Sequence, residues 1–175
     1  MTLLPEPREQ TLEGATVAWS EPVVSASPNL RLQGYALTID GSGIRLQAAD
    51  AAGEFYGRMT LRQLRRLHPE GPPTGTIRDW PDLPERGVML DVSRDKVPTM
   101  ATLLALVDRL AEWKINHLEL YAEHTFAYSD HEVVWRDASP FTPDEIDELD
   151  AYCTARHIAL VPNQNCLGQI GRAHV

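Results

Sequence analysis

Apolar and polar residues alternate along two adjacent segments in the first half of the chain. From Tyr35 to Ile39 every second residue is apolar, which is the period of a strand with one buried face. Residues 41–43 read Gly-Ser-Gly and predict a tight turn, and the alternation resumes over residues 44–48. The pattern therefore predicts a β-hairpin.

A helical pattern follows the hairpin. Between Asp50 and Leu67 the apolar residues recur every three or four positions, or close to that, and the proline-rich residues 69–73 end the pattern. The first part of the chain has little periodicity, and we expect one or two short strands there, for example at residues 16–19. Because a sheet and one amphipathic helix can share a core, residues 1–80 predict a small α+β domain.

The pattern changes after residue 81. Short, nearly continuous apolar runs occupy residues 87–92, 117–121 and 158–161, as in the buried strands of a parallel sheet. One helix is expected after Thr99, and another after Thr142, where Thr-Pro-Asp-Glu predicts a capping box with proline at the first helical position. This alternation of strand and helix is the beginning of a parallel α/β fold.

Composition and charge narrow the possible partners. Hydrophobic residues make up 43% of the chain and charged residues 23%, as in an ordinary globular protein. The formal charge of −9 argues against nucleic acid and against an anionic membrane surface. No apolar run approaches the roughly 20 residues of a membrane helix, and the N-terminus lacks the features of a secretory signal. Only Cys153 and Cys166 could form a disulfide; we expect none, and a cytoplasmic location.

Four segments, in the same order along the chain, resemble motifs of glycoside hydrolase family 20. Residues 35–64, which include Gly-Glu-Phe-Tyr-Gly-Arg-Met-Thr-Leu-Arg-Gln-Leu, resemble the small domain that precedes the barrel in that family. Residues 77–94, with Arg-Gly-Val-Met-Leu-Asp-Val-Ser-Arg, are similar to its first barrel strand. Residues 114–116 match the lead into the second strand, and residues 162–168 the exit of the third.

The resemblance implies a small α+β domain followed by the first three βα units of a truncated (β/α)8 TIM barrel. It also implies a retaining β-N-acetylhexosaminidase, in which the 2-acetamido group of a terminal N-acetylhexosamine attacks the anomeric carbon. In the family a Glu protonates the leaving oxygen, its Asp neighbour orients the acetamido group, and both follow the fourth strand. We therefore expect the catalytic pair beyond residue 175 and no activity in the chain itself.

The end of the chain is expected to be foreign to the protein. Residues 170–175 read Ile-Gly-Arg-Ala-His-Val, which a common sequencing-adapter string encodes. The chain would then comprise the small domain at residues 1–80, part of the barrel at residues 81–169, and a tail at residues 170–175. The alternative is a genuine C-terminus that happens to match.

Arg86 is the first candidate for substrate binding. The resemblance implies that its guanidinium binds the 3- and 4-hydroxyls of the terminal sugar, a task that suits its fixed fork of donors. The alternative is a salt bridge at the start of the strand, for example with Asp79. Asp91 and Arg94 match the same motif, and we expect them to form a buried ion pair that braces the site.

Four more candidates follow the second and third strands, at the face where barrel enzymes hold their chemistry. Glu123 and His124 would bind sugar or tune the missing acid, or they form an exposed loop pair. Asn163 and Asn165 stand where the family usually has Glu and Asp. They would support the absent Glu, or they form a plain turn. This departure indicates a divergent branch, and the choice between GlcNAc and GalNAc stays open.

The segment at residues 124–141 is longer than the usual βα loop of about 2–6 residues. Its aromatic residues would stack on sugar or pack on the barrel rim; they are Phe126, Tyr128, Trp135 and Phe141. The histidines in this segment fit no metal motif, so we expect no metal and no cofactor.

The intact protein is thus expected to be a hexosaminidase-like glycoside hydrolase that acts on an N-acetylhexosamine-containing glycan or glycoside. The alternative is a non-catalytic carbohydrate-binding protein. An Asp-Glu pair after a fourth strand in the longer gene would decide between the two. No pattern in the sequence indicates an oligomeric state.

Overall fold

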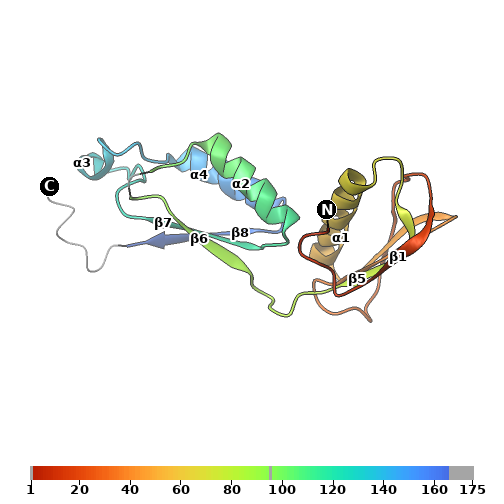
Figure 1. Ribbon diagram of the computed structural model, residues 1–175. Coiled ribbons are helices and arrows are strands. Elements are labelled where there is room, and N and C mark those ends of the chain that lie inside the picture. The colour runs from red at the N-terminus through yellow and green to blue at the C-terminus, as the bar shows by residue number, and fades with distance from the viewer. Residues whose placement is uncertain (1, 95, 166–175) are drawn as a thin grey trace. The chain divides into compact units, whose positions relative to one another are not determined.

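The computed structural model describes residues 2–94 and 96–165, and the chain divides into two units, each with its own sheet (Figure 1). The first unit comprises residues 1–84 and 111–114, and the second residues 85–110 and 115–175. Cys166 and the tail at residues 170–175 lie outside the described residues. The adapter origin of that tail and the boundary near residue 80 stay predictions.

The first unit is built on a five-stranded sheet in the order β1-β5-β3-β4-β2. The strands are β1 (Glu9–Thr16), β2 (Val23–Ala26), β3 (Tyr35–Asp40), β4 (Gly43–Ala48) and β5 (Pro73–Asp79). Only β2 and β4 pair in parallel; the other pairs are antiparallel. The predicted hairpin is confirmed as β3 and β4, in which Leu37 pairs with Leu46.

Strands β1 and β2 agree with the one or two short strands expected near the N-terminus, but the example at residues 16–19 was wrong and β5 was not predicted. No strand occupies residues 17–19; instead β1 ends at Thr16 and β2 begins at Val23. The sequence pattern also missed β5, which lies in the middle of the sheet between β1 and β3. This strand begins with Pro73 and contains Gly75, two residue types that strand interiors usually exclude. Proline at the first position of a strand blocks none of the later ladder bonds.

Helix α1 (Ala51–Leu67) packs against the sheet through its two glycines. The Asp50 side chain caps the helix by accepting from the Gly53 N–H at 2.8 Å. A Cβ at Gly53 would lie 2.3 Å from the Gly34 carbonyl oxygen, and one at Gly57 would lie 2.4 Å from the Leu46 side chain. Close contact between helix and sheet therefore requires glycine at both positions.

The core of this unit is closed. Every second residue of β3 and β4 is buried, and residues of α1 cover them. The hydrophobic and aromatic side chains of this unit that are at most 2% exposed are Tyr35, Leu37, Ile39, Ile44, Leu46, Tyr56, Leu64 and Ile77. Burial of this apolar surface is the main favourable term in the stability of the unit.

A polar network is buried beside that core. The Lys114 ammonium lies 2.5 Å from an Asp79 carboxylate oxygen and donates to the Tyr35 hydroxyl at 2.9 Å. Tyr35 also shares a 2.6 Å hydrogen bond with Thr60. Burial, and then the charge of Asp79, raise the pKa of Tyr35 well above its ordinary value, so it stays neutral. Asp79, suggested above as a partner of Arg86, is instead paired with Lys114.

The second unit is a three-stranded parallel sheet in the order β6-β7-β8. Its elements are β6 (Gly87–Asp91), α2 (Met100–Glu112), β7 (His117–Ala122), α3 (Glu132–Trp135), α4 (Pro143–Thr154) and β8 (Ala159–Gln164). The three predicted strands and the two predicted helices, α2 and α4, are confirmed. Both helices lie over the same face of the sheet (Figure 1).

The capping box predicted at Thr142 is present. The Thr142 hydroxyl accepts from the Glu145 N–H at 3.2 Å, and the Glu145 carboxylate accepts from the Thr142 N–H at 2.8 Å. The helix buries Leu149 and Cys153, as its spacing predicted, and Ile146 is half-buried. None of the described helices is long and apolar enough to cross a membrane.

Candidate functional site

Polar side chains gather on the face of the second sheet that α2 and α4 leave uncovered. Leu118 and Leu120 of β7 are buried, at 0% and 6% exposure, on the helix-covered face. Because side chains alternate along a strand, Glu119 and Tyr121 point to the opposite face. In a parallel sheet all the carboxyl ends lie at one edge, so the residues that follow β6, β7 and β8 meet there.

Glu123 is the centre of this group. It follows β7, its side chain is only 8% exposed, and one of its carboxylate oxygens accepts from the Tyr121 hydroxyl at 2.8 Å. The same oxygen accepts from Arg94 at 3.2 Å, and the Glu123 N–H donates to the Ser93 hydroxyl at 2.6 Å. The hydrogen bond to Glu123, and then the charge of that carboxylate, raise the pKa of Arg94.

Asn163 and Asn165 extend the network from β8. Asn165 donates to the Tyr121 hydroxyl at 2.6 Å, and Asn163 donates to the Glu119 carboxylate at 2.5 Å. The predicted residues Glu123 and Asn165 are thus joined through Tyr121.

Arg86 lies at the other end of the sheet. It precedes β6, and its main chain forms two hydrogen bonds with Asn116, at 2.8 and 2.9 Å. Five residues of strand, at about 3.3 Å each, put its Cα about 16 Å from that of Asp91. The structure brings Glu123, Asn163 and Asn165 together and leaves Arg86 apart, and its predicted role stays a prediction.

The ion pair expected between Asp91 and Arg94 is weaker than predicted. The two groups are 3.8 Å apart, and their side chains are 32% and 48% exposed, so the pair is not buried. Arg94 lies nearer to Glu123, and Asp91 accepts from the Ser93 N–H at 2.9 Å. The reason is the tight turn after β6, which directs the Asp91 carboxylate to the backbone of its own loop.

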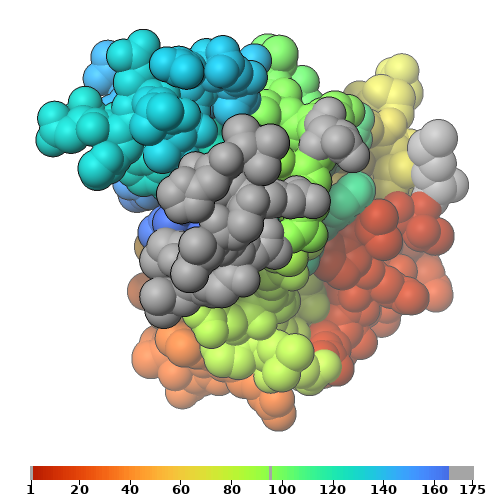
Figure 2. All heavy atoms as spheres, turned by 90° about the vertical axis from the view of Figure 1, so that its left-hand side faces the viewer, coloured from red at the N-terminus to blue at the C-terminus, as the bar shows by residue number. Residues whose placement is uncertain are grey.

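The segment at residues 124–141 forms a surface lobe of the second unit, drawn in cyan in Figure 2. His124, the first residue of the segment, is half-buried. Phe141 is 5% exposed and bonds through its backbone to Thr125 and Ala127, at 2.9 Å each. Trp135 is half-buried, and its indole N–H donates to the Tyr128 carbonyl at 2.9 Å. For Phe141, then, the structure favours the rim-packing alternative over a surface that stacks on sugar.

Two polar members of the network, Glu119 and Tyr121, were not singled out from the sequence. The signal for them was available, because a two-residue period places Glu119, Tyr121 and Glu123 on one face. Within residues 2–94 and 96–165, no three His, Cys, Asp or Glu side chains gather closely enough to hold a metal ion. The chemistry offered by the network is hydrogen bonding to hydroxyl and amide groups.

Comparison with known proteins places these features in a family. Residues 21–80 match the model of glycosyl hydrolase family 20, domain 2. The chain is 32% identical over 195 residues to a β-hexosaminidase of Akkermansia muciniphila, an alignment that covers 99% of this chain and 39% of that protein. The chain belongs to glycosyl hydrolase family 20.

Solved structures of family 20 agree with this assignment. A crystal structure of a β-N-acetylhexosaminidase, 32% identical, superimposes with a TM-score of 0.80 over 91% of this chain and 39% of its own. The β-N-acetylhexosaminidase from Bacteroides fragilis, at 18% identity, shares the fold, with a TM-score of 0.85 over 98% of this chain and 46% of its own. The family 20 chain described here thus spans less than half the length of these relatives.

Proposed function

We propose that the protein to which this chain belongs is a β-N-acetylhexosaminidase that removes a terminal N-acetylhexosamine. The observation that carries the proposal is the polar network at the carboxyl ends of β6, β7 and β8, in a chain whose relatives are β-hexosaminidases. Barrel enzymes hold their chemistry at this edge of the sheet.

The second unit supplies the first three strands of a (β/α)8 barrel in this proposal. Two observations support it: the strands follow one another in sequence order, and both crossover helices lie on one face of the sheet (Figure 1). A doubly wound sheet reverses its strand order and carries helices on both faces. The uncovered face, with Glu119 and Tyr121, would then line the barrel interior.

The network offers hydrogen-bonding groups to a sugar; it does not supply the catalytic Glu and its Asp partner. Tyr121 and Arg94 both donate to one carboxylate oxygen of Glu123, which fixes the position of the group and leaves its other oxygen to accept from a sugar hydroxyl. The family resemblance puts the acid and its Asp partner after a fourth strand, so the substrate's own acetamido group would attack there.

The experiment that tests this proposal compares the 175-residue chain with the longer protein. We expect no release of nitrophenol from nitrophenyl N-acetylglucosaminide or galactosaminide by the chain alone, and release by the longer protein. Turnover by the 175-residue chain would contradict the placement of the catalytic pair. Binding of N-acetylglucosamine by the longer protein without turnover would favour the carbohydrate-binding alternative.

The role proposed for Arg86 can be tested in the longer protein. Two neighbouring sugar hydroxyls need two parallel donors, which lysine lacks, so Arg86→Ala and Arg86→Lys should both lower kcat/KM. Charge-assisted hydrogen bonds are worth about 1.5–3 kcal/mol each, so we expect a loss of about tenfold to a hundredfold. Part of the loss should fall in kcat, because binding of the non-reacting hydroxyls helps to reach the transition state.

Arg109→Ala is the matched control for Arg86. Arg109 is an exposed arginine in the last turn of α2, so its removal changes the net charge equally without touching the uncovered face of the sheet. If Arg86→Ala keeps the kcat/KM of the Arg109→Ala variant and only its Tm falls, Arg86 is a structural residue.

A further inference from the structure

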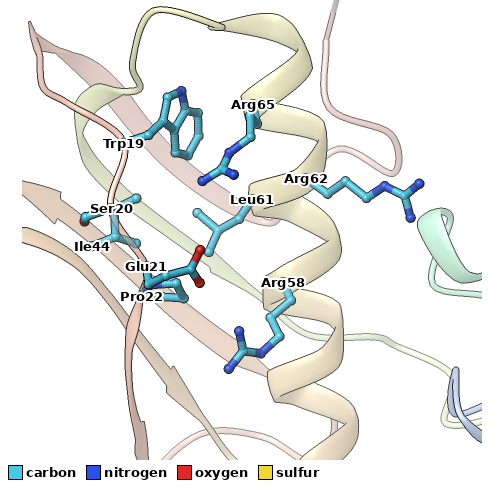
Figure 3. Close-up of a pocket in the computed structure, with 9 residues that line it drawn as sticks. All are labelled: Trp19, Ser20, Glu21, Pro22, Ile44, Arg58, Leu61, Arg62 and Arg65. Atoms are coloured by element: carbon cyan, nitrogen blue, oxygen red, sulfur yellow. The ribbon is translucent and has the colours of Figure 1, made fainter.

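A pocket of about 200 Å³ opens on the first unit between α1 and the segment that joins β1 to β2 (Figure 3). The apolar side chains of Leu61 and Ile44 form its floor, and Pro22 lies at its side. Around them stand charged and aromatic groups from both segments. None of these residues belongs to the polar network of the second unit.

The charged side chains of this pocket differ in whether they have an ion-pair partner. Arg58 is paired with Glu54 at 2.8 Å, and Arg62 points away from the pocket and lies 3.4 Å from Glu112 (Figure 3). Arg65 has no carboxylate partner among the described residues. Glu21 likewise has no ion pair within that part of the chain. The pocket therefore presents one cation and one carboxylate with unused hydrogen-bonding capacity.

Trp19 fixes the position of Arg65. The guanidinium carbon of Arg65 lies 4.9 Å from the centre of the Trp19 ring, and the indole N–H donates to the His68 carbonyl at 2.8 Å. A guanidinium that lies against an aromatic ring keeps the N–H donors along its edge available. Such an edge binds a carboxylate or sulfate through two parallel hydrogen bonds.

We propose that this pocket binds an acidic sugar, with the anionic substituent on Arg65 and a ring hydroxyl donating to Glu21. Three observations favour this ligand. A bare anion would be repelled by Glu21, whose carboxylate projects toward the arginine side of the pocket (Figure 3). An apolar floor suits the C–H face of a pyranose ring. The volume of about 200 Å³ suits one monosaccharide unit rather than a longer ligand.

The test is a titration of the isotope-labelled 175-residue chain, followed through the indole N–H signal of Trp19, which a Trp19→Phe variant identifies. The probes are glucuronic acid, N-acetylglucosamine 6-sulfate, neutral N-acetylglucosamine, inorganic sulfate and glycine. We expect the Trp19 signal to move with one or both acidic sugars. A response to glucuronic acid indicates a carboxylate ligand, and a response to N-acetylglucosamine 6-sulfate indicates a sulfate ester. Equal affinity for neutral N-acetylglucosamine, or tighter binding of sulfate or glycine, would overturn the proposal.

Variants test the two named contacts. Arg65→Ala should weaken binding of the acidic sugar about tenfold or more, and Arg65→Lys should recover little of it. Arg78→Ala is the matched control, since Arg78 is an exposed arginine outside the pocket; the loss there should stay below about twofold. Glu21→Gln should weaken binding of the acidic sugar and strengthen that of sulfate. Equal losses for Arg65→Ala and Arg78→Ala would contradict a specific site.

These results do not depend on the proposed hexosaminidase activity. The Trp19 signal reports on the first unit, whereas activity is measured in the longer protein. If the longer protein is inactive, the titration still tests the acidic-sugar pocket. If the Trp19 signal does not move, the hexosaminidase activity of the longer protein can still be measured.

Discussion

The two units of this chain differ in how fully the apolar side chains of their sheets are buried. In the first unit the inward-facing residues of β3 are almost fully buried; Leu37 and Ile39 are 0% and 1% exposed. In the second unit Leu118 is also 0% exposed on the helix-covered face, but Val88, which pairs with it on that face, is 37% exposed, and Met89 on the opposite face is 57% exposed. Each sheet has one helix-covered face, and that face is fully buried along β3 and β4 in the first unit but only partly buried along β6 and β8 in the second.

The residues that resemble the family serve different purposes in the two units. In the first unit they are packing residues: Gly53 and Gly57 allow the helix to approach the sheet, and Leu64 is 1% exposed in the core. Gln63 of the same motif holds the backbone of Leu4 with hydrogen bonds of 2.8 and 2.9 Å. In the second unit the matching residues end strands and carry hydrogen-bonding groups. Similarity in the first unit therefore indicates ancestry, and any chemistry must be argued from the second.

The largest expected effect tests the closed core of the first unit. Leu37→Ala removes a fully buried side chain from the middle of the sheet, so the free energy of unfolding should fall by about 2–5 kcal/mol. Urea unfolding of the first unit, followed by the signals of its strands, measures this. Leu32→Ala is the control, because Leu32 is 71% exposed and should change stability by less than about 0.5 kcal/mol. Similar losses in both variants would contradict a closed core.

The second-largest expected effect is a difference in hydrogen exchange rate between the two sheets. Amide protons of β7 and β8 should exchange with solvent at least about a hundredfold faster than those of β3 and β4, because β8 lies at an edge of the three-stranded sheet and its residues are only partly buried, whereas β3 and β4 are inner strands of a five-stranded sheet. Hydrogen exchange of the 175-residue chain measures both sets in one sample. Equal protection, or a single reversible melt above about 65 °C, would show that the second unit is as stable as the first.

Much of this architecture followed from periodicity. The hairpin of β3 and β4 and the capping box at Thr142 were predicted because each depends on residues close together in the sequence. Strand β5 was missed because its pairing partners are distant: Ile77 pairs with Leu37 on one side and Gln10 on the other. Its proline and glycine also obscure the alternation. Partners that are remote in sequence override local propensity.

The candidate site could be predicted only in part. From the sequence, Glu123, Asn163 and Asn165 were expected at one edge because they follow the carboxyl ends of parallel strands. In the structure Tyr121 links Asn165 to Glu123, and Asn163 bonds separately to Glu119. Hydrogen bonding between specific side chains depends on strand register, which the sequence does not supply. Register pairs Tyr121 with Asn163, and this pairing puts β7 and β8 side chains within reach. The sequence placed Arg86 directly before a strand that begins at Gly87, as in the structure, but it did not show that the length of this strand separates Arg86 from the other candidates.

Cys153 offers a smaller test of the helix-covered face in the second unit. Burial raises the pKa of the Cys153 thiol from 9.0 to about 11, so a thiol reagent should not modify it in the folded chain near pH 8. Because the folded-state pKa is the higher one, this thiol favours folding below pH 9, and that contribution is lost as pH rises toward 11. Tm between pH 8 and 11 should therefore fall more for the parent than for Cys153→Ala.

A Cys166→Ser background makes the reagent assay specific to Cys153. Rapid modification of Cys153 near pH 8 in that background would show that α4 separates readily from the sheet. The helix-covered face of the second sheet would then become accessible to solvent as readily as its uncovered face.

The smallest expected effect concerns the N-terminus of α4. Thr142→Ala removes the hydroxyl that accepts from the Glu145 N–H, and a lost cap of this kind costs about 0.5–2 kcal/mol. Thr142→Ser keeps the hydroxyl and should lose much less. Since the Glu145 carboxylate accepts from the Thr142 N–H in return, Glu145→Ala should also destabilise, and the double variant should lose less than the sum. Urea unfolding monitored through α4 measures all four proteins. Additive losses would show that the two hydrogen bonds act independently. If the free energy of unfolding of the first unit is unchanged in every variant, the two sheets unfold separately.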